Sequence, residues 1–231
     1  MVVQRILVLD GSPAGEQASG MAACVANNAG QLHVLAYRQE AGKQAAEGVS
    51  LLAAEVLQQA GWSHAQGTAP DMVAVVVGPG SFTGLRASCA AAAGYAVGVG
   101  CPVVGVTRAE ALAPELDAIL AAQAEKVAGW LVVTAARRGR VFVEDAQGAR
   151  AVTVADWVPP AGTWLVAGEA CSELAFPSVI QSHVSHPDVK QIAVAALKRV
   201  EGELPPRSAL PLYVDPPEAK LPANGLRAAP V

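Results

Sequence analysis

The residues best placed for chemistry in this sequence form one glycine-rich stretch, GPGSFTGLR, at residues 78–86. An apolar, β-branched run typical of a strand precedes it, and an alanine-rich segment typical of a helix follows it. Ser81 or Thr83 can cap that helix, and Arg86 lies one turn inside it. Free N–H groups, a positive helix end and a guanidinium suit an anion, whereas a tight turn with a capping hydroxyl explains the same residues equally well. The glycines that would let the backbone approach such a partner are Gly78, Gly80 and Gly84.

The spacing of this stretch excludes three common glycine-rich loops. A Walker loop ends in Gly-Lys-Ser/Thr, but here Gly84 is followed by Leu85. The dinucleotide-binding fingerprint needs its third glycine where Thr83 stands. A nucleophile elbow needs a glycine two positions on either side of its serine, and around Ser81 these positions hold Pro79 and Thr83. An anion site and a capped turn therefore remain as the two alternatives.

The apolar pattern predicts an α/β fold in which one order of elements occurs twice. The first unit has three strands in an antiparallel meander, a helix, a strand, a second helix and a last strand. These elements are expected over residues 5–12, 20–27, 30–38, 43–60, 71–78, 84–99 and 101–106. From about residue 127 the order starts again, and its strands and last helix are expected over residues 128–136, 139–145, 149–155, 163–170 and 187–200. The sequence therefore predicts a duplicated fold with a cleft between the halves.

Local signals support several of these boundaries. Residues 27–30, NNAG, favour a hairpin. Thr107 with Glu110 forms a capping box that opens a further helix, and Pro187 suits the first turn of the last helix. Six prolines lie between residues 205 and 222, which predicts an extended tail.

Composition excludes several classes of protein. The chain has 16 Lys or Arg against 20 Asp or Glu, so unaided binding to nucleic acid is not expected. The N-terminal residues enter a strand directly, without the pattern of a secretion leader. Residues 87–106 carry no charge, but they are rich in Ala and Gly and predict a buried helix, a turn and a strand rather than a membrane span. Widely spaced cysteines predict reduced thiols in a cytoplasmic protein; they are Cys24, Cys89, Cys101 and Cys171.

Small residues recur along the helix that follows the glycine-rich stretch. Spacings of three and four residues place them on one face, which lets a second helix approach closely. That helix could belong to another molecule, or the face could pack against the chain's own sheet. The residues of this face are Gly84, Ala87, Ala91, Gly94 and Gly98.

The stretch GPGSFTGLR resembles the hallmark of the TsaB (YeaZ) family, a branch of the ASKHA superfamily of actin-like folds. Weaker matches follow in the family's order along nearly the whole chain, namely ILVLDGS, PVVGVTRAEALA, ARRGRVF and ALPLYVD. The resemblance implies two duplicated actin-like (ribonuclease H-like) subdomains, each a mixed sheet with an antiparallel meander and flanking helices. The expected ranges are 1–108 and 109–204, followed by a Pro-rich tail over 205–231.

The resemblance also implies a role in making threonylcarbamoyladenosine beside the anticodon of tRNA. In the family, TsaB carries no chemistry, pairs with the transferase TsaD and works with the ATPase TsaE. The chain is therefore expected to form a homodimer when alone, to meet tRNA only through the complex, and to bind no cofactor stably, with ATP or ADP held within the complex. The implied partner interface is Leu52, Val56, Leu85, Ala87, Ala91, Gly94, Tyr95 and Gly98. The implied phosphate-loop residues are Asp10, Ser12, Gly78, Gly80, Ser81, Thr83, Gly84 and Arg86.

The residue types agree with a non-catalytic relative that lacks a metal site. The catalytic relative carries a His-x-x-x-His metal pair, and Arg108 and Leu112 stand at the corresponding positions here, where neither can hold a divalent ion. His183 and His186, with Asp188 nearby, could form a zinc site, but a solvated loop and helix start is the favoured interpretation. The rival hypothesis is a metal-dependent, glycoprotease-like peptidase or a sugar-kinase-like phosphotransferase, for which Asp10 is the well-placed carboxylate.

Two further polar groups have ordinary interpretations. Glu144 and Asp145 are expected to be solvated at a hairpin end. The arginines of ARRGR form a basic cluster that is either a solvated turn or a contact to tRNA within the complex; they are Arg137, Arg138 and Arg140.

Overall fold

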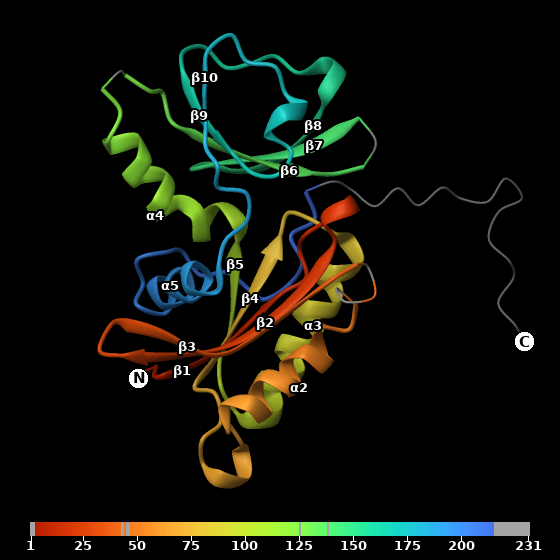
Figure 1. The fold of residues 1–231 in the computed structure, drawn as a ribbon, viewed down its shortest axis with the longest axis vertical. Coiled ribbons are helices and arrows are strands. Elements are labelled where there is room, and N and C mark those ends of the chain that lie inside the picture. Colours follow the sequence, from red (N-terminus) through yellow and green to blue (C-terminus); the bar gives the residue numbers. More distant parts are fainter. Residues whose placement is uncertain (1–2, 43, 45–46, 125, 138, 215–231) are drawn as a thin grey trace, which may run out of the picture.

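The computed structural model describes residues 3–42, 44, 47–124, 126–137 and 139–214, which form two five-stranded sheets (Figure 1). The first sheet has the order β3-β2-β1-β4-β5. β1 to β3 form an antiparallel meander, and β4 and β5 run parallel to β1. The strands are β1 (Arg5–Asp10), β2 (Ser19–Asn28), β3 (Gln31–Ala41), β4 (Met72–Gly78) and β5 (Val103–Thr107).

The second sheet repeats this scheme with the order β10-β9-β6-β7-β8. β6 to β8 form the meander, and β9 and β10 run parallel to β6. The strands are β6 (Trp130–Ala135), β7 (Arg140–Asp145), β8 (Gly148–Thr153), β9 (Trp164–Ala167) and β10 (Val179–Gln181). The repetition confirms the predicted α/β fold of two duplicated mixed sheets.

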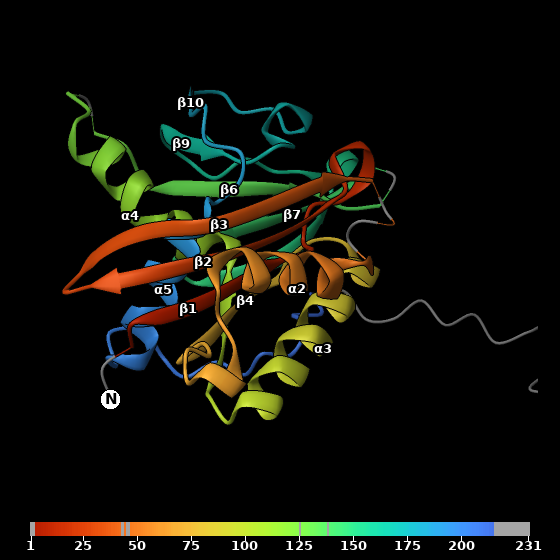
Figure 2. The ribbon, with the colours of Figure 1, turned by 60° about the horizontal axis from the view of Figure 1, so that its bottom comes forward.

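Helices cover both faces of the first sheet. α2 (Val49–Ala60) and α3 (Phe82–Val99) pack on one face, and α5 (Val189–Val200) packs on the other (Figures 1 and 2). α4 (Arg108–Ala121) starts directly after β5 and packs on the second sheet. The short 3₁₀ helices are η1 (Gly15–Gln17), η2 (His64–Gln66), η3 (Val154–Asp156) and η4 (Cys171–Glu173).

The double cover explains why the central strands are apolar without alternation. In β1, Leu7 and Leu9 belong to the core beneath α2 and α3. Ile6 and Val8 belong to the core beneath α5, because successive side chains of a strand point to opposite faces. A sheet covered on both faces therefore needs apolar residues at every position.

Helix α5 returns from the second sheet to the first. Its buried residues, among them Val189, Ile192 and Ala196, pack with residues of β1, β2, β4 and β5. The range expected for the second subdomain, 109–204, thus contains a helix that belongs to the first sheet by packing. The boundaries at residues 108 and 204 stay predictions.

Several local signals have the expected outcome. The hairpin turn uses Ala29 and Gly30 at φ 52° and 90°, which matches the right-handed twist of the flanking strands. The Thr107–Glu110 capping box is present. Pro187 is a correction, since it lies before the N-cap Asp188, which forms its own capping box with Gln191.

The uncharged run at residues 87–106 forms most of α3, a turn and most of β5, as expected, but α3 is not a buried helix, since Val97 on it is 84% exposed. In the part of the chain that the structure describes, no helix has both the length and the apolar character to cross a membrane.

The first ten residues of the expected tail pack against the first sheet. The Leu212 amide donates to the Val77 carbonyl at 2.7 Å, and Leu212 joins the core beneath α3. The Ser208 carbonyl lies so close to β5 that a Cβ at Gly105 would come within 2.5 Å of its oxygen. Residues 205–214 are therefore part of the fold, and residues 215–231 lie outside the described residues.

We predict that Ile192→Ala lowers the free energy of unfolding by about 2–4 kcal/mol, because the removed atoms leave a cavity between α5 and the first sheet. Val200→Ala is the matched control on the same helix, since Val200 is 41% exposed, and its effect should stay within about 0.5 kcal/mol. Urea unfolding measures both, and equal effects would contradict the packing of α5 on the first sheet.

Candidate functional site

The glycine-rich stretch packs against the end of β1. The Ser81 amide donates to the Ser12 carbonyl at 2.8 Å, and the Ser12 amide donates to Asp10 Oδ1 at 2.7 Å. A Cβ at Gly80 would lie only 2.1 Å from the Ser12 carbonyl oxygen. The close approach that this glycine permits is therefore to the chain's own backbone.

The start of α3 has the capped-turn geometry. Ser81 is the N-cap, and its hydroxyl accepts from the Gly84 amide at 3.3 Å. Gly78 has φ 122°, a conformation that side chains rarely adopt, and a Cβ there would meet Leu85 at 3.0 Å. Thr83 is exposed, while Gly84 is buried. These contacts account for the serine and the glycines without a ligand.

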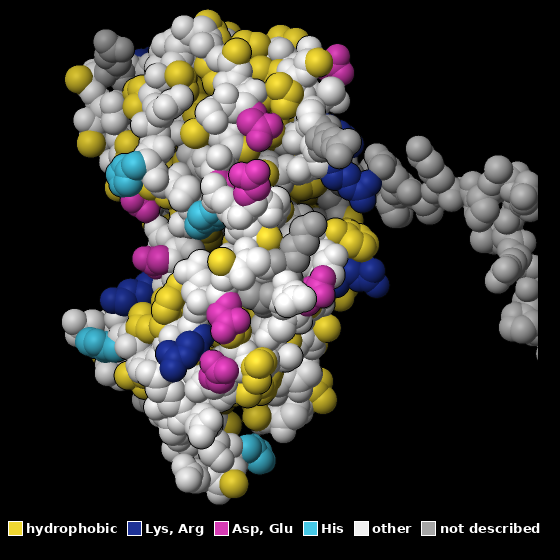
Figure 3. Space-filling model, turned by 45° about the vertical axis from the view of Figure 1, so that its right-hand side comes forward, with side chains coloured by type: hydrophobic (Ala, Val, Ile, Leu, Met, Phe, Trp, Pro, Cys, Tyr) yellow, Lys and Arg dark blue, Asp and Glu magenta, His cyan; other side chains and the backbone are white. Residues whose placement is uncertain are grey.

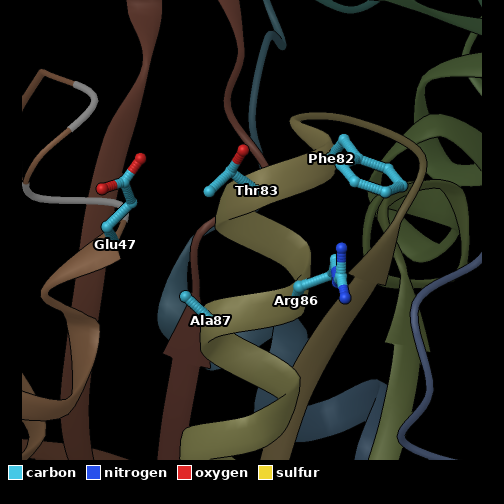
Figure 4. Close-up of a pocket in the computed structure, with 5 residues that line it drawn as sticks. All are labelled: Glu47, Phe82, Thr83, Arg86 and Ala87. Carbon is cyan, nitrogen blue, oxygen red and sulfur yellow. The ribbon is translucent and has the colours of Figure 1, made fainter. Parts of the chain in front are cut away.

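Arg86 lies in an open hollow of about 440 Å³ at the start of α3. Figure 4 shows this hollow with Arg86 and Phe82 on one side and Glu47 across from Thr83. The guanidinium carbon is 5.1 Å from the centre of the Phe82 ring, whose other contact is the Tyr213 ring at 5.5 Å. The structure thus holds Arg86 by a cation–π contact at the surface.

Asp10 and Ser12 do not share that hollow with Arg86. Asp10 is 3% exposed and Ser12 is fully buried. Burial raises the pKa of Asp10, and the hydrogen bonds from Ser12 together with the charges of Arg108 and His186 oppose this only in part. Asp10 and Ser12 therefore lie next to Gly80 and Ser81 but do not line the hollow that holds Arg86, and anion binding at Arg86 stays a prediction.

The expected partner interface is also divided between core and surface. Leu52, Val56 and Leu85 are at most 2% exposed and pack in the core beneath the helices, so these three cannot contact a partner. Gly94 and Gly98 are exposed. The remaining members, Ala87, Ala91 and Tyr95, are half-buried, and the Tyr95 hydroxyl donates to the Ser50 carbonyl of α2 at 3.2 Å.

Exposed apolar and small residues also lie on both α2 and α3, two helices that the Tyr95–Ser50 hydrogen bond joins. Leu51 is 64% exposed and Val97 is 84% exposed. We call this the α2–α3 surface and define it by Leu51, Ala54, Ala90, Gly94, Val97 and Gly98. Sequence reasoning missed Leu51 and Val97, although the i, i+4 spacing of Leu52 and Val56 already marked the buried face of α2.

The structure also shows a buried polar cluster that the sequence did not indicate. Arg108 is fully buried at the start of α4, and its guanidinium donates to both carboxylate oxygens of Glu169 at 3.0 and 2.6 Å. It also donates to the Ser185 carbonyl at 3.0 Å and contacts His186 Nδ1 at 2.8 Å. Burial alone would raise the pKa of Glu169, but the Arg108 charge and hydrogen bonds hold it below its usual value.

His186 is a correction to the expected solvated loop. Its side chain is 30% exposed, and Nε2 lies 2.7 Å from Gln17 Oε1, while Nδ1 faces Arg108. Because a guanidinium only donates, Nδ1 accepts and Nε2 carries the proton. Burial, together with the Arg108 charge, lowers the pKa of His186 below 6.5. His183 is exposed, as expected.

Glu144 is a second correction, because it is 2% exposed rather than solvated. It pairs with Val132 across the meander and so faces α4. Burial raises the pKa of Glu144 to about 8, against smaller opposing effects of the Thr107 hydroxyl, the Arg108 charge and the Ala109 amide. Asp145 forms the solvated turn instead, with an ion pair to Arg150 at 2.6 Å.

The positions that correspond to metal ligands in the catalytic relative have other roles here. Arg108 is committed to Glu169, and Leu112 is fully buried in the core of the second half. Across the described residues, no group of three or more His, Cys, Asp or Glu side chains could hold a metal ion. Burial raises the pKa of two cysteines, Cys24 to about 12 and Cys89 to about 11, so neither thiol is activated.

Comparisons with known proteins agree with this architecture. The family model for TsaD, tRNA N6-adenosine threonylcarbamoyltransferase, matches residues 38–160. Uncharacterized proteins of Mycobacterium bovis and Mycobacterium tuberculosis are 38% identical over 162 residues, which cover 66% of this chain and 69% of theirs.

Two solved structures from Pseudomonas aeruginosa share the fold, each at 20% sequence identity. One is YeaZ, with a TM-score of 0.63 over 91% of this chain and 99% of its own. The other is an uncharacterized protein with similarity to peptidase YeaZ, with a TM-score of 0.65 over 92% of this chain and 100% of its own.

The two mixed sheets define an α/β fold of two duplicated halves, the fold of the YeaZ structures. The chain belongs to the family of the matching TsaD model, with the fold of the YeaZ (TsaB) proteins.

We predict that Gly80→Ala destabilises the protein by about 2 kcal/mol or more, because the new methyl group would overlap the Ser12 carbonyl. Gly94→Ala, within α3, is the control; nothing lies within 4 Å of a Cβ built there, so the higher helix propensity of alanine should stabilise the chain by about 0.5–1 kcal/mol. Thermal unfolding distinguishes the two, and a neutral Gly80→Ala would contradict the close packing of the loop.

We predict that Glu144→Gln changes the pH dependence of stability. The pKa of Glu144 is about 8 in the folded chain and 4.5 when unfolded, so its contribution is full below pH 4.5 and is lost as the pH rises through 8. The Gln variant should therefore become more stable than the parent as the pH rises, in urea titrations from pH 5 to 8.

Asp145→Asn is the control for this titration. The pKa of Asp145 is lowered, because its hydrogen bonds and ion pair with Arg150 outweigh partial burial, so this variant should lose stability above pH 4. Parallel pH curves for the parent and Glu144→Gln would contradict the burial of the Glu144 carboxylate.

Proposed function

We propose that this protein is a non-catalytic partner of TsaD in the threonylcarbamoyladenosine modification of tRNA, and that it scaffolds a complex of TsaD and TsaE. The observation that carries the proposal is the α2–α3 surface, which presents exposed leucine and valine beside exposed glycines. Small residues let a partner helix approach closely, and the apolar side chains beside them gain by leaving water. Such a surface suits a protein partner rather than a small substrate.

Two features support a non-catalytic role. The carboxylate best placed for kinase chemistry, Asp10, is 3% exposed and accepts from the Ser12 amide. Arg108 and Leu112 are used in an ion pair and in the core. On this proposal, ATP or ADP binds within the complex rather than stably to this chain, and the isolated chain forms a homodimer through the same α2–α3 surface.

Charge supports indirect contact with tRNA. On the described residues of the face in Figure 3, Lys and Arg side chains are few and interspersed with Asp and Glu. The formal net charge of the chain is −4. Within the expected basic cluster, Arg137 is exposed beside the β6–β7 turn, and Arg138 lies outside the described residues. On this proposal the cluster touches tRNA only when the complex holds it.

The experiment is size-exclusion chromatography with light scattering on this chain mixed with TsaD from the same organism, with and without ATP and TsaE. We expect a heterodimer that replaces the homodimer of the isolated chain. Failure to associate under every condition would overturn the proposal.

We predict that Gly94→Trp abolishes pairing with TsaD while the chain stays folded, because a bulky ring on the exposed helix face prevents close helix approach. Val158→Trp is the matched control, since Val158 is 81% exposed in the second half of the molecule, and it should pair normally. Circular dichroism confirms folding, and unimpaired pairing of Gly94→Trp would count against the α2–α3 surface as the interface.

A further inference from the structure

The chain crosses between the two halves at two places, and both crossings meet at one side chain. The first crossing is Thr107–Arg108, where β5 of the first sheet leads directly into α4 on the second (Figure 1). The second is the segment between β10 and α5, which carries Ser185 and His186. Arg108 begins α4 in the first crossing and hydrogen-bonds both residues of the second.

These contacts extend into a continuous series of hydrogen bonds that runs from one half to the other. Gln17, in η1 after β1, contacts His186, and His186 contacts Arg108. Arg108 then pairs with Glu169, which follows β9 and also accepts from the Ala135 amide at the end of β6, at 3.2 Å. The hydrogen bonds thus run from the first half through the second crossing and then the first crossing to the second half.

This series of hydrogen bonds depends on the protonation state of His186. Nδ1 of His186 must be unprotonated to accept from Arg108, and the acceptor and the donor nitrogen are 2.8 Å apart. A proton on Nδ1 would place two cations at that distance and remove the acceptor. The charged groups that face His186 are Arg108, Glu169 at 4.0 Å and Asp10. Both carboxylates favour the proton, whereas burial of the ring, the larger effect, and the Arg108 charge disfavour it, and these two lower the pKa of His186.

We propose that Gln17, His186, Arg108 and Glu169 form an acid-sensitive latch that fixes the angle between the two halves. With the imidazole neutral, the latch joins both crossings and holds the halves rigidly. When His186 is protonated, it repels the guanidinium, Gln17 loses its link to Arg108, and the halves move about their two crossings. The proposal concerns the isolated chain and does not depend on any partner.

The effect of pH on the stability that the latch contributes has a defined direction. Because the pKa of His186 is lowered on folding, the latch contributes its full stability above pH 6.5 and loses it as the pH falls from there through the folded pKa. Acidification therefore opens the latch.

The test measures the distance between spin labels in the two halves by pulsed electron resonance. Ala65 in η2 and Val158 are exposed sites for the labels, introduced as Ala65→Cys and Val158→Cys. The partly exposed Cys101 and Cys171 are replaced by alanine, and excess unlabelled protein removes distances between molecules. At pH 7.5 we expect one narrow distance, and at pH 5 a broader distribution, because acidification protonates His186.

The decisive variant is His186→Gln, whose amide keeps one acceptor and one donor but cannot be protonated in this range. It should keep the narrow distance at both pH values, whereas His183→Gln, on the exposed neighbouring histidine, should broaden on acidification like the parent. A parent distribution that does not change between the two pH values, or a His186→Gln variant that broadens as much as the parent, would overturn the proposal.

Discussion

The arrangement of the two halves depends on the buried guanidinium of Arg108. A buried arginine is stable only when its charge is matched by nearby acceptors, and the two terminal nitrogens of Arg108 find these acceptors in Glu169, Ser185 and His186. None of these groups is near Arg108 in the sequence, so all the crossing segments must be in place before the charge is compensated. Removing a single partner would leave an uncompensated buried ion, which typically costs about 3–5 kcal/mol. The contacts of Arg108 therefore restrict how the two sheets are placed, in addition to contributing to stability.

The glycine-rich stretch serves the same architecture by another physical means. Its glycine at position 80 allows two backbone segments, the end of β1 and the start of α3, to touch where a side chain would prevent it. This contact fixes where α3 begins, and hence which of its residues reach solvent. The exposed part of α3, with Val97, Gly94 and Gly98, is thus positioned by a loop that looks like a ligand-binding motif in sequence.

Much of this fold could be predicted from the sequence because its signals are local. The alternation of strands and helices, the hairpin at residues 27–30 and the capping box at Thr107 depend on neighbours within a few positions. The failures involve residues whose surroundings come from distant segments. Glu144 looked solvated because it borders a turn, yet the register with Val132 directs it beneath α4. Leu52 was expected at a partner interface because the resemblance places its helix there, but the resemblance does not say which face of that helix packs on the sheet.

The candidate site shows the same division. The capping role of Ser81 is a short-range property and could be read from the spacing to Gly84. The separation of Asp10 from Arg86, and the gathering of Arg108, Glu169 and His186, depend on how two sheets and two crossings meet. Contacts between residues more than sixty positions apart have no signature in a single sequence.

The return of α5 to the first sheet has a consequence for how the protein is made. One face of that sheet is covered by residues 189–200, so the strands from residues 5–107 lack this cover until residue 200 has been synthesised. During synthesis the whole second sheet emerges while apolar residues such as Ile6 and Val8 still await α5. Pairing across such sequence separations is slow to form, and an uncovered apolar sheet face promotes aggregation. Although the two halves share one design, they therefore cannot fold one after the other. The first half acquires its last helix only after the second sheet has been synthesised.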